Sequence, residues 1–118
     1  NTTRDLTFVK DTANGFIEIS KNEKLNGEST NIGMNEEISI KNLIEKISKI
    51  TGKTIKIITD QKRIRPEKSE VSRLVCDNSK IKKYTNWKPE YNLENGLEET
   101  IDWIEKNKKL FKFEIYNQ

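Results

Sequence analysis

The feature that most constrains the fold is a regular spacing of large aliphatic residues between Ser39 and Gly52. The residues recur three or four positions apart, as Ile40, Leu43, Ile44, Ile47 and Ile50. This spacing places all of them on one face of an α-helix. Serine is favoured just before the first turn of a helix, and glycine just after the last turn. The sequence therefore predicts an amphipathic helix over 40–50 whose apolar face must pack against another element.

A second amphipathic segment near the end of the chain offers a partner for that helix. Asn92 is a typical helix-capping residue, and the residues Leu93, Leu97, Ile101 and Ile104 follow it at helical spacing. A chain of 118 residues is expected to build one core, so the two apolar faces should pack together. The expected core therefore consists of Ile44, Ile47, Leu97 and Ile101, with Trp87 filling a join between two helices.

Shorter patterns fill the rest of the chain. Phe8 and Val9 predict the end of a strand, and Asp11 predicts the N-cap of a helix over 12–20. The further expected elements are a turn at Asn26–Gly27, a strand over 28–33, a strand over 54–59, an extended piece over 71–76, a helix from Asp77 or Ser79 through Tyr84, and a strand or packed extension over 108–118. The fold class is therefore α/β, with one small mixed α/β domain over residues 1–118.

Composition excludes several classes of function. Charged residues make up 35% of the chain, but acidic and basic residues alternate and the net charge is only +3, which is too mild for a nucleic-acid surface. Cys76 is the only cysteine, so an intrachain disulfide is impossible and a reducing compartment such as the cytoplasm fits. Without histidine, the chain lacks the residues for a zinc site or a His-activated nucleophile. No apolar run is long enough to cross a membrane, so no membrane partner is expected.

Two arginine-containing motifs point to an anionic ligand. The first is Arg4-Asp5, and the second is Arg63-Ile64-Arg65-Pro66-Glu67. The planar guanidinium group donates paired hydrogen bonds to phosphate oxygens. Pro66 restricts Arg65 to an extended conformation, which fixes the direction of its side chain. Two such arginines could grip one diphosphate from two sides.

These motifs, together with two later ones, resemble a known enzyme family. The later motifs are Asp77-Asn78-Ser79-Lys80-Ile81 and Asn86-Trp87-Lys88-Pro89. In this order, from Arg4 to about Asn107, they resemble the C-terminal, substrate-binding part of the extended short-chain dehydrogenase/reductases. These enzymes are NAD-dependent sugar-nucleotide epimerases and dehydratases. The segment Arg-Pro-x-x-Ser-Glu-Val is most similar to bacterial nucleoside-diphosphate-hexose 4,6-dehydratases, which serve cell-surface polysaccharide biosynthesis.

The resemblance implies a role for each arginine. Arg65 would contact the diphosphate of a nucleoside-diphosphate sugar. Arg4 would either contact the diphosphate or hold the loop that does so. The alternatives are a solvated surface arginine for Arg65, and an ion pair with Asp5 or Asp11 for Arg4.

The resemblance also implies an acidic residue close to the ribose. Glu70 would accept hydrogen bonds from the ribose hydroxyls, since a carboxylate only accepts and a vicinal diol donates twice. The spacing after Arg-Pro leaves Glu67 as the alternative for this role. A small residue at Gly15 would let its helix pack closely, although simple tolerance of glycine is the other interpretation.

The cofactor-binding and catalytic motifs of the family are expected to lie outside this chain. The glycines at 15, 27, 33, 52 and 96 are too scattered for a dinucleotide-binding turn. Tyr84 and Lys88 have the Tyr-x-x-x-Lys spacing of the family's catalytic pair, but Pro89 pushes Lys88 out of the helical region. We therefore expect NAD or NADP to bind an N-terminal Rossmann domain of a longer parent. The resemblance implies a homodimeric or tetrameric parent, and this chain alone is expected to be inactive.

Two questions stay open at the level of sequence. A dehydratase and an epimerase share their first hydride step, and these motifs do not separate the two. The alternative from another class is a free-standing, non-catalytic α/β module for protein interaction or nucleotide sensing. In that case the arginines would be ordinary surface charges.

Overall fold

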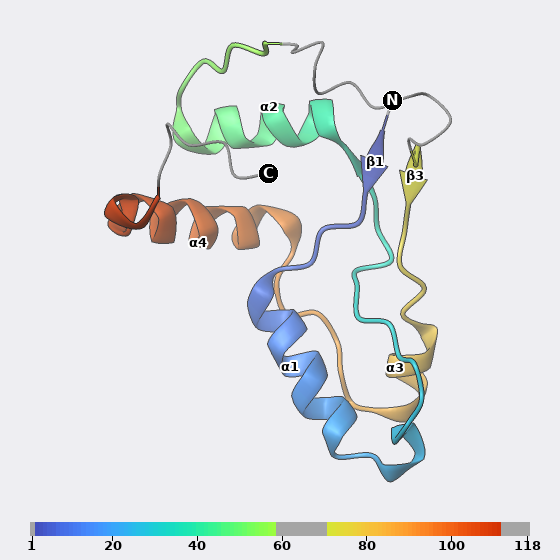
Figure 1. Cartoon of the computed structure of the whole chain (residues 1–118). Coiled ribbons are helices and arrows are strands. Elements are labelled where there is room, and N and C mark those ends of the chain that lie inside the picture. Colours follow the sequence, from blue (N-terminus) through green and yellow to red (C-terminus); the bar gives the residue numbers. More distant parts are fainter. Residues whose placement is uncertain (1, 59–70, 112–118) are drawn as a thin grey trace.

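The structure is a computed structural model that describes residues 2–58 and 71–111. Its helices and strands follow the order β1 Thr3–Arg4, α1 Val9–Ser20, β2 Ile38–Ser39, α2 Ile40–Thr51, β3 Arg73–Leu74, α3 Ser79–Tyr84 and α4 Leu93–Lys106 (Figure 1). Single 3-10 turns cover Glu23–Leu25 and Lys108–Leu110. The predicted small mixed α/β domain is confirmed.

A short three-stranded sheet has β1 at its centre. β1 pairs antiparallel with β2, with Arg4 opposite Ile38, and parallel with β3, with Arg4 opposite Leu74. The chain passes directly from β2 into α2, so that Ser39 both ends the strand and caps the helix. The sheet thus brings the N-terminal arginine motif beside the chain that follows residue 70.

The predicted helices α2 and α4 are confirmed at their ends. The Ser39 hydroxyl accepts a hydrogen bond from the Asn42 amide at 3.1 Å, and the Asn92 side chain accepts one from the Asn95 amide at 2.9 Å. Gly52 follows α2 with a left-handed φ of 63°. The two helices lie beside each other in Figure 1, and an ion pair between Lys46 and Glu94 joins them.

The apolar faces of α2 and α4 are only partly covered. The four aliphatic residues that were expected to form the core there, Ile44, Ile47, Leu97 and Ile101, are all half-buried. No residue of α2 is fully buried. The prediction that the helices pair is therefore confirmed, but they do not enclose the main core.

The best-buried side chains lie around α1 and α3. Ile81 is completely buried, and Trp87 and Leu25 are nearly so. The Trp87 indole Nε1 donates a hydrogen bond to the backbone carbonyl of Asp11 at 3.0 Å. Trp87 thus fills the join between helices as predicted, whereas Ile81 and Leu25 were not predicted as core residues.

The predicted start of the first helix is wrong. Phe8 and Val9 do not end a strand, because β1 stops at Arg4 and α1 begins at Val9 with Phe8 at its N-cap. Asp11 is not the N-cap but a buried residue of the first turn. Its carboxylate accepts hydrogen bonds from the backbone amides of Glu90 at 2.9 Å and Tyr91 at 3.1 Å. Asp11 accepts hydrogen bonds from amides about 80 residues away and not from the first amides of its own helix. A local sequence pattern does not predict contacts over this distance.

Two predicted strands are also absent from the described residues. Residues 28–33 form no ladder, although half-buried Thr30 and Ile32 alternate with exposed Ser29 and Asn31 as in a strand. Residues 54–58 are exposed and unpaired in the described part of the chain, and Thr59 lies outside it. Both stretches have β-forming composition, but a strand needs a neighbouring strand to pair with. The extended piece over 71–76 is confirmed only at β3.

Glycine allows one close approach between these parts. A Cβ atom on Gly15 would lie 2.7 Å from Ile32 Cδ1, so α1 packs on the 28–33 segment only because residue 15 has no side chain. The close packing implied by the resemblance is confirmed. Phe111 packs edge-on against Trp103 with ring centroids 5.9 Å apart, and residues 112–118 of the predicted C-terminal extension lie outside the described residues.

Candidate functional site

The structure places one of the three predicted site residues. Arg4 lies on the central strand of the sheet, whereas Arg65 and Glu70, together with the alternative Glu67, lie outside the described residues. The described chain resumes at Val71, directly after Glu70 in sequence. The surroundings of Arg4 and Val71 therefore define the part of the candidate site that can be built atom by atom.

Arg4 ties the central strand to the chain that follows residue 70. Its Nη1 donates hydrogen bonds to the carbonyl oxygens of Thr3 at 2.7 Å and Val71 at 2.9 Å. Charge-assisted bonds of this kind fix both partners more firmly than neutral ones. The contact attaches β1 to the first described residue after Glu70, and the two roles expected for Arg4 stay predictions.

Asp5 forms a junction beside Arg4 that the sequence did not indicate. Its Oδ1 accepts a hydrogen bond from the Met34 amide at 3.0 Å. Its Oδ2 accepts hydrogen bonds from the amides of Asn35 at 2.9 Å and Cys76 at 3.0 Å. Asn35 has a left-handed φ of 59°, which asparagine tolerates better than most residues. The carboxylate therefore joins two segments that are far apart in sequence. The only sequence signal was that Asp5 neighbours Arg4, and it suggested an ion pair instead.

Gly33 and Cys76 complete this junction by close packing. A Cβ atom on Gly33 would overlap Cys76 Cβ and lie only 2.6 Å from its Sγ. Burial raises the pKa of the Cys76 thiol, and the negative charges of Asp5 and Asp77 raise it further. A raised pKa makes a thiol a weaker nucleophile, and the close contact with Gly33 gives Cys76 a packing role.

A network of exposed polar and charged side chains lies across the three-stranded sheet. The Glu37 carboxylate accepts hydrogen bonds from the Thr3 hydroxyl at 2.6 Å and from Arg73 Nε at 2.7 Å. The Arg73 guanidinium holds the pKa of Glu37 below its usual value, with a smaller contribution from Thr3. This network links β1 to β3 and to the residues just before β2.

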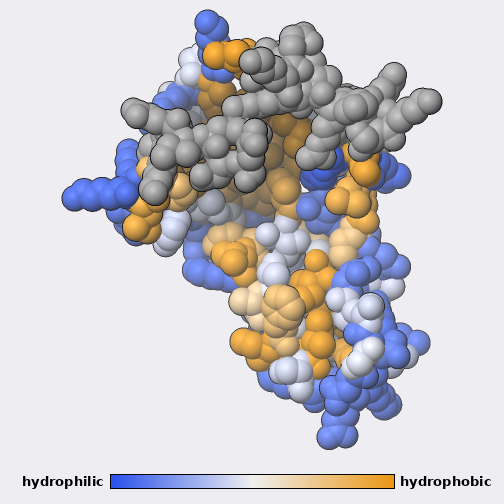
Figure 2. All heavy atoms as spheres, viewed as in Figure 1, coloured by the Kyte–Doolittle hydropathy of each residue, from blue (hydrophilic) through white to orange (hydrophobic). Residues whose placement is uncertain are grey.

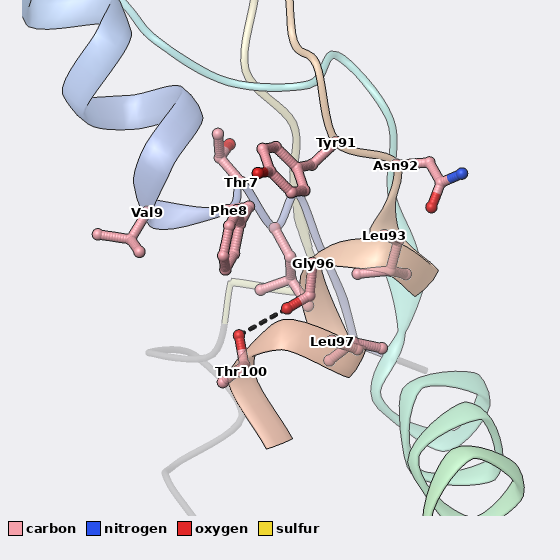
Figure 3. A pocket seen from close by; sticks show the side chains of 10 residues that line it. Thr7, Phe8, Val9, Tyr91, Asn92, Leu93, Gly96, Leu97 and Thr100 are labelled. Carbon is pink, nitrogen blue, oxygen red and sulfur yellow. Dashed lines mark hydrogen bonds between the residues drawn. The ribbon is translucent and has the colours of Figure 1, made fainter. Parts of the chain in front are cut away.

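A hollow of about 300 Å³ opens between the start of α1 and the start of α4 (Figure 3). The Phe8 and Tyr91 rings form one wall, with centroids 4.6 Å apart and planes inclined at 50°. Lys10 Nζ lies 5.5 Å from the Tyr91 ring centroid and pairs with Glu99 at 2.5 Å. Phe8 approaches α4 closely because residue 96 is glycine, where a Cβ atom would be 3.1 Å from Phe8 Cβ.

This hollow adjoins a smaller one at Arg4. The smaller hollow, of about 50 Å³, is lined by Arg4, Met34 and Glu37, among others, and it shares Leu6 and Leu93 with the larger one. The two hollows are therefore neighbours on either side of Leu6 and Leu93. The arginine lines only the smaller hollow, and the Phe8–Tyr91 wall lines only the larger one.

The described residues do not form a cofactor or catalytic centre of the family type. The glycines are used otherwise: Gly27 and Gly52 have left-handed φ angles in turns, and Gly15, Gly33 and Gly96 allow close packing. They therefore do not fit the pyrophosphate of NAD. Tyr84 ends α3, so Lys88 does not lie one helical turn after it on the same helix. The described ranges contain no group of three possible metal ligands and no helix long and apolar enough to cross a membrane.

Comparison with known proteins agrees with this fold and its motifs. The family model for GDP-mannose 4,6 dehydratase matches residues 1–100. The UDP-glucuronate 4-epimerase of Thermodesulfobacterium geofontis is 36% identical over 110 residues, which are 92% of this chain and 32% of that protein. The chain thus spans about a third of the length of this relative.

Two solved structures have the same fold over nearly the whole chain. One is the UDP-glucuronic acid 4-epimerase from Bacillus cereus in complex with NAD, with a TM-score of 0.75, 28% identity, and coverage of 95% of this chain and 33% of that one. The other is the dTDP-glucose 4,6-dehydratase from Bacillus anthracis in complex with NAD, with a TM-score of 0.72, 29% identity, and coverage of 94% and 34%. The chain therefore belongs to the GDP-mannose 4,6-dehydratase family of extended short-chain dehydrogenase/reductases, the NAD-dependent sugar-nucleotide epimerases and dehydratases.

Proposed function

We propose that the chain is the nucleotide-sugar-binding part of an NAD(P)-dependent sugar-nucleotide epimerase or 4,6-dehydratase. In this proposal Arg65 binds the diphosphate, Glu70 accepts hydrogen bonds from the ribose, and Arg4 holds their loop or shares the diphosphate. The observation that carries it is the 2.9 Å hydrogen bond from Arg4 Nη1 to the carbonyl of Val71. Val71 directly follows Glu70, so this bond attaches the Arg4 motif to the chain that continues from the proposed binding segment.

The chain's own contribution to catalysis is positioning. Bound NAD(P) supplies the redox chemistry in this class of enzyme, and the described residues do not fit it. Holding the diphosphate in one place makes the reaction of the attached sugar effectively intramolecular, which is a large part of enzymatic rate enhancement. We therefore propose that this polypeptide alone turns over no sugar nucleotide and binds no NAD tightly.

The shape of the chain supports a larger parent. Its radius of gyration is 17.1 Å, whereas a compact domain of this length has about 13.5 Å. The side chains of Val9, Phe16 and Ile17 on α1 are more than half exposed, and apolar residues gather over α1 in Figure 2. Exposed apolar patches of this kind mark interaction sites. We propose that this face packs against an N-terminal Rossmann domain, in a cytoplasmic parent that is a homodimer or tetramer.

A pair of arginine substitutions in the full-length parent tests the proposed function. Arg65→Ala should raise KM for the nucleotide sugar by the equivalent of about 2–3 kcal/mol, since a charge-assisted bidentate contact is lost. Arg63→Ala is the matched control, because it removes the same charge two residues away. A solvated surface charge is worth less than about 1 kcal/mol, so its effect should be small.

Calorimetry with NAD separates substrate binding from cofactor binding. NAD affinity of the parent should be the same in both arginine variants, because the cofactor binds the other domain. Equal effects of the two substitutions on KM, or loss of NAD binding in Arg65→Ala, would contradict the assignment. Submicromolar NAD binding by the isolated 118-residue chain would contradict the proposal that NAD binds a different domain.

A further inference from the structure

We infer that Asp5 is a positioning residue for substrate binding, acting through the backbone and not by touching the ligand. The inference rests on the proposed function of the Arg65–Glu70 segment. Its basis is that the Asp5 carboxylate, directly beside Arg4, accepts hydrogen bonds from three backbone amides of two segments. The N···O distances are 2.9 to 3.0 Å. It assigns to Asp5 the task of fixing the chain that leads out of the substrate-binding loop.

Asp5 and Arg4 hold this chain at two points. The Arg4 side chain binds the Val71 carbonyl, and the Asp5 side chain binds the Cys76 amide. Between them, the Asp5 amide donates to the Leu74 carbonyl at 3.0 Å. Residues 71–76 are therefore fixed at both ends by two consecutive residues, Arg4 at the end of β1 and Asp5 directly after it. This attachment fixes the point from which the chain continues after Glu70.

Asp5 also fixes one wall of the small hollow at Arg4. Its bonds to the amides of Met34 and Asn35 hold the turn that follows Gly33. Met34 lines the small hollow at Arg4. The same carboxylate thus sets the distance between the wall formed by Met34 and the segment that follows residue 70.

The chemistry at this position requires a carboxylate. A carboxylate has two accepting oxygens, and both are used here. Asparagine has one accepting oxygen, and its NH₂ group would face at least one backbone donor. Asp5→Asn therefore keeps the size of the side chain while breaking one side of the junction.

Asp11 supplies the matched control. It is also an aspartate whose two oxygens accept backbone amides, but it holds Glu90 and Tyr91 and not the 71–76 segment. Asp11→Asn should lower the thermal midpoint without changing substrate affinity. Asp5→Asn should lower the midpoint and also raise KM about tenfold, as for one lost charge-assisted bond, with kcat changed less than KM.

The experiment compares Asp5→Asn, Asp11→Asn and Arg65→Ala in the full-length parent, below the lowest thermal midpoint. Trp87→Phe, which removes the bond to the Asp11 carbonyl, replaces Asp11→Asn if that variant does not fold. A KM increase confined to Asp5→Asn and Arg65→Ala supports the inference. A rise for Arg65→Ala but not for Asp5→Asn, or equal rises for Asp5→Asn and the control, overturns it. No rise for Arg65→Ala overturns the proposed function itself, and the inference with it.

The single thiol reports on the junction without any substrate. The negative charge of Asp5 contributes to the raised pKa of Cys76. In Asp5→Asn the thiol pKa should fall, so that alkylation of Cys76 by iodoacetamide at neutral pH becomes faster than in the wild type and in the control. An unchanged alkylation rate in Asp5→Asn would show that the carboxylate does not govern this junction.

Discussion

The two sides of the molecule show opposite relations between sequence pattern and burial. The paired-helix side, α2 and α4, has the most regular amphipathic spacing but no fully buried apolar side chain. The Trp87 side, which comprises α1, α3 and residues 87–91, has weaker patterns and a glycine inside α1. It nevertheless contains the buried residues Ile81, Trp87 and Asp11. Regular spacing indicates that a helix forms, whereas burial depends on which distant residues reach it.

The difference is explained by the type of contact on each side. On the paired-helix side, the helices meet through half-buried aliphatic faces and an exposed ion pair between Lys46 and Glu94. On the Trp87 side, buried polar groups are satisfied across the chain by the hydrogen bonds of Asp11 and Trp87. Buried and satisfied polar groups specify one arrangement more strictly than apolar faces do. The Trp87 side should therefore be the more sensitive to substitution.

The largest expected effect is that of Trp87→Ala. Removal of a buried tryptophan leaves a large cavity and removes the indole bond to the Asp11 carbonyl, and should cost about 3–5 kcal/mol of unfolding free energy. Trp103→Ala is the control on the paired-helix side, where the ring is 53% exposed. Urea denaturation followed by circular dichroism measures both. Similar losses for the two tryptophans would remove the distinction between the sides.

Gly33→Ala should have the next largest effect, a loss of about 1–3 kcal/mol of unfolding free energy. The added methyl group would collide with Cys76, where the packing is already tight. The measurement is the thermal midpoint together with the urea midpoint. Cys76→Gly in the same chain removes the colliding atoms and should recover part of the loss. A double variant no more stable than Gly33→Ala would show that the contact is not the cause.

Ser39→Ala tests the paired-helix side and should cost about 1 kcal/mol, since the hydroxyl caps α2 at the Asn42 amide. Ser39→Asp keeps an accepting oxygen and should retain most of the stability. Hydrogen exchange of the α2 amides gives the local readout. Loss of protection across α1 as well as α2 would show that the two sides unfold together.

The smallest expected effect concerns pH and the ion pair between Lys46 and Glu94. The hydrogen bond from Lys46 holds the pKa of Glu94 below its usual value of 4.5. A carboxyl group with a lowered folded-state pKa stabilises the fold above its unfolded value, and this contribution is lost as the pH falls through the folded value. The midpoint of Glu94→Gln should therefore lie slightly below that of the wild type at neutral pH. The two midpoints should converge well below pH 4.5.

Added salt checks the same contact. Surface ion pairs are screened, so salt should shrink the neutral-pH difference between Glu94→Gln and the wild type. Glu98→Gln on the same helix is the control. A difference that persists in acid or in high salt would show that Glu94 acts through packing and not through charge.

Local signals predicted the parts of the fold that local forces decide. The caps at Ser39 and Asn92 and the stop at Gly52 were predictable because serine, asparagine and glycine satisfy helix ends within a few residues. The buried position of Trp87 was predictable from its size. The absence of a strand over 28–33 was not predictable, because pairing depends on a neighbouring strand and not on composition alone.

Less of the candidate site follows from local sequence. The motif around Arg4 predicts an arginine that binds an anion or holds a loop, and its bond to Val71 was not predicted. The three amides on Asp5 and the two on Asp11 were not predictable, since Asp5 beside Arg4 suggests an ion pair and Asp11 near a helix start suggests a cap. Arg65 and Glu70 remain predictions, because they lie outside the described residues.

The contacts of residues 4–11 reach far along the chain, and this has a consequence for biosynthesis. The bonds of Arg4 to Val71, Asp5 to Cys76 and Asp11 to Tyr91 span 67, 71 and 80 residues. Contacts with such large sequence separation close long loops and form slowly. On the ribosome, residues 4–11 therefore wait for these partners until residues 71–91 have emerged. The small hollow at Arg4 also needs Leu93, so a ribosome that stalls before residue 91 releases a chain that lacks α4 and this hollow.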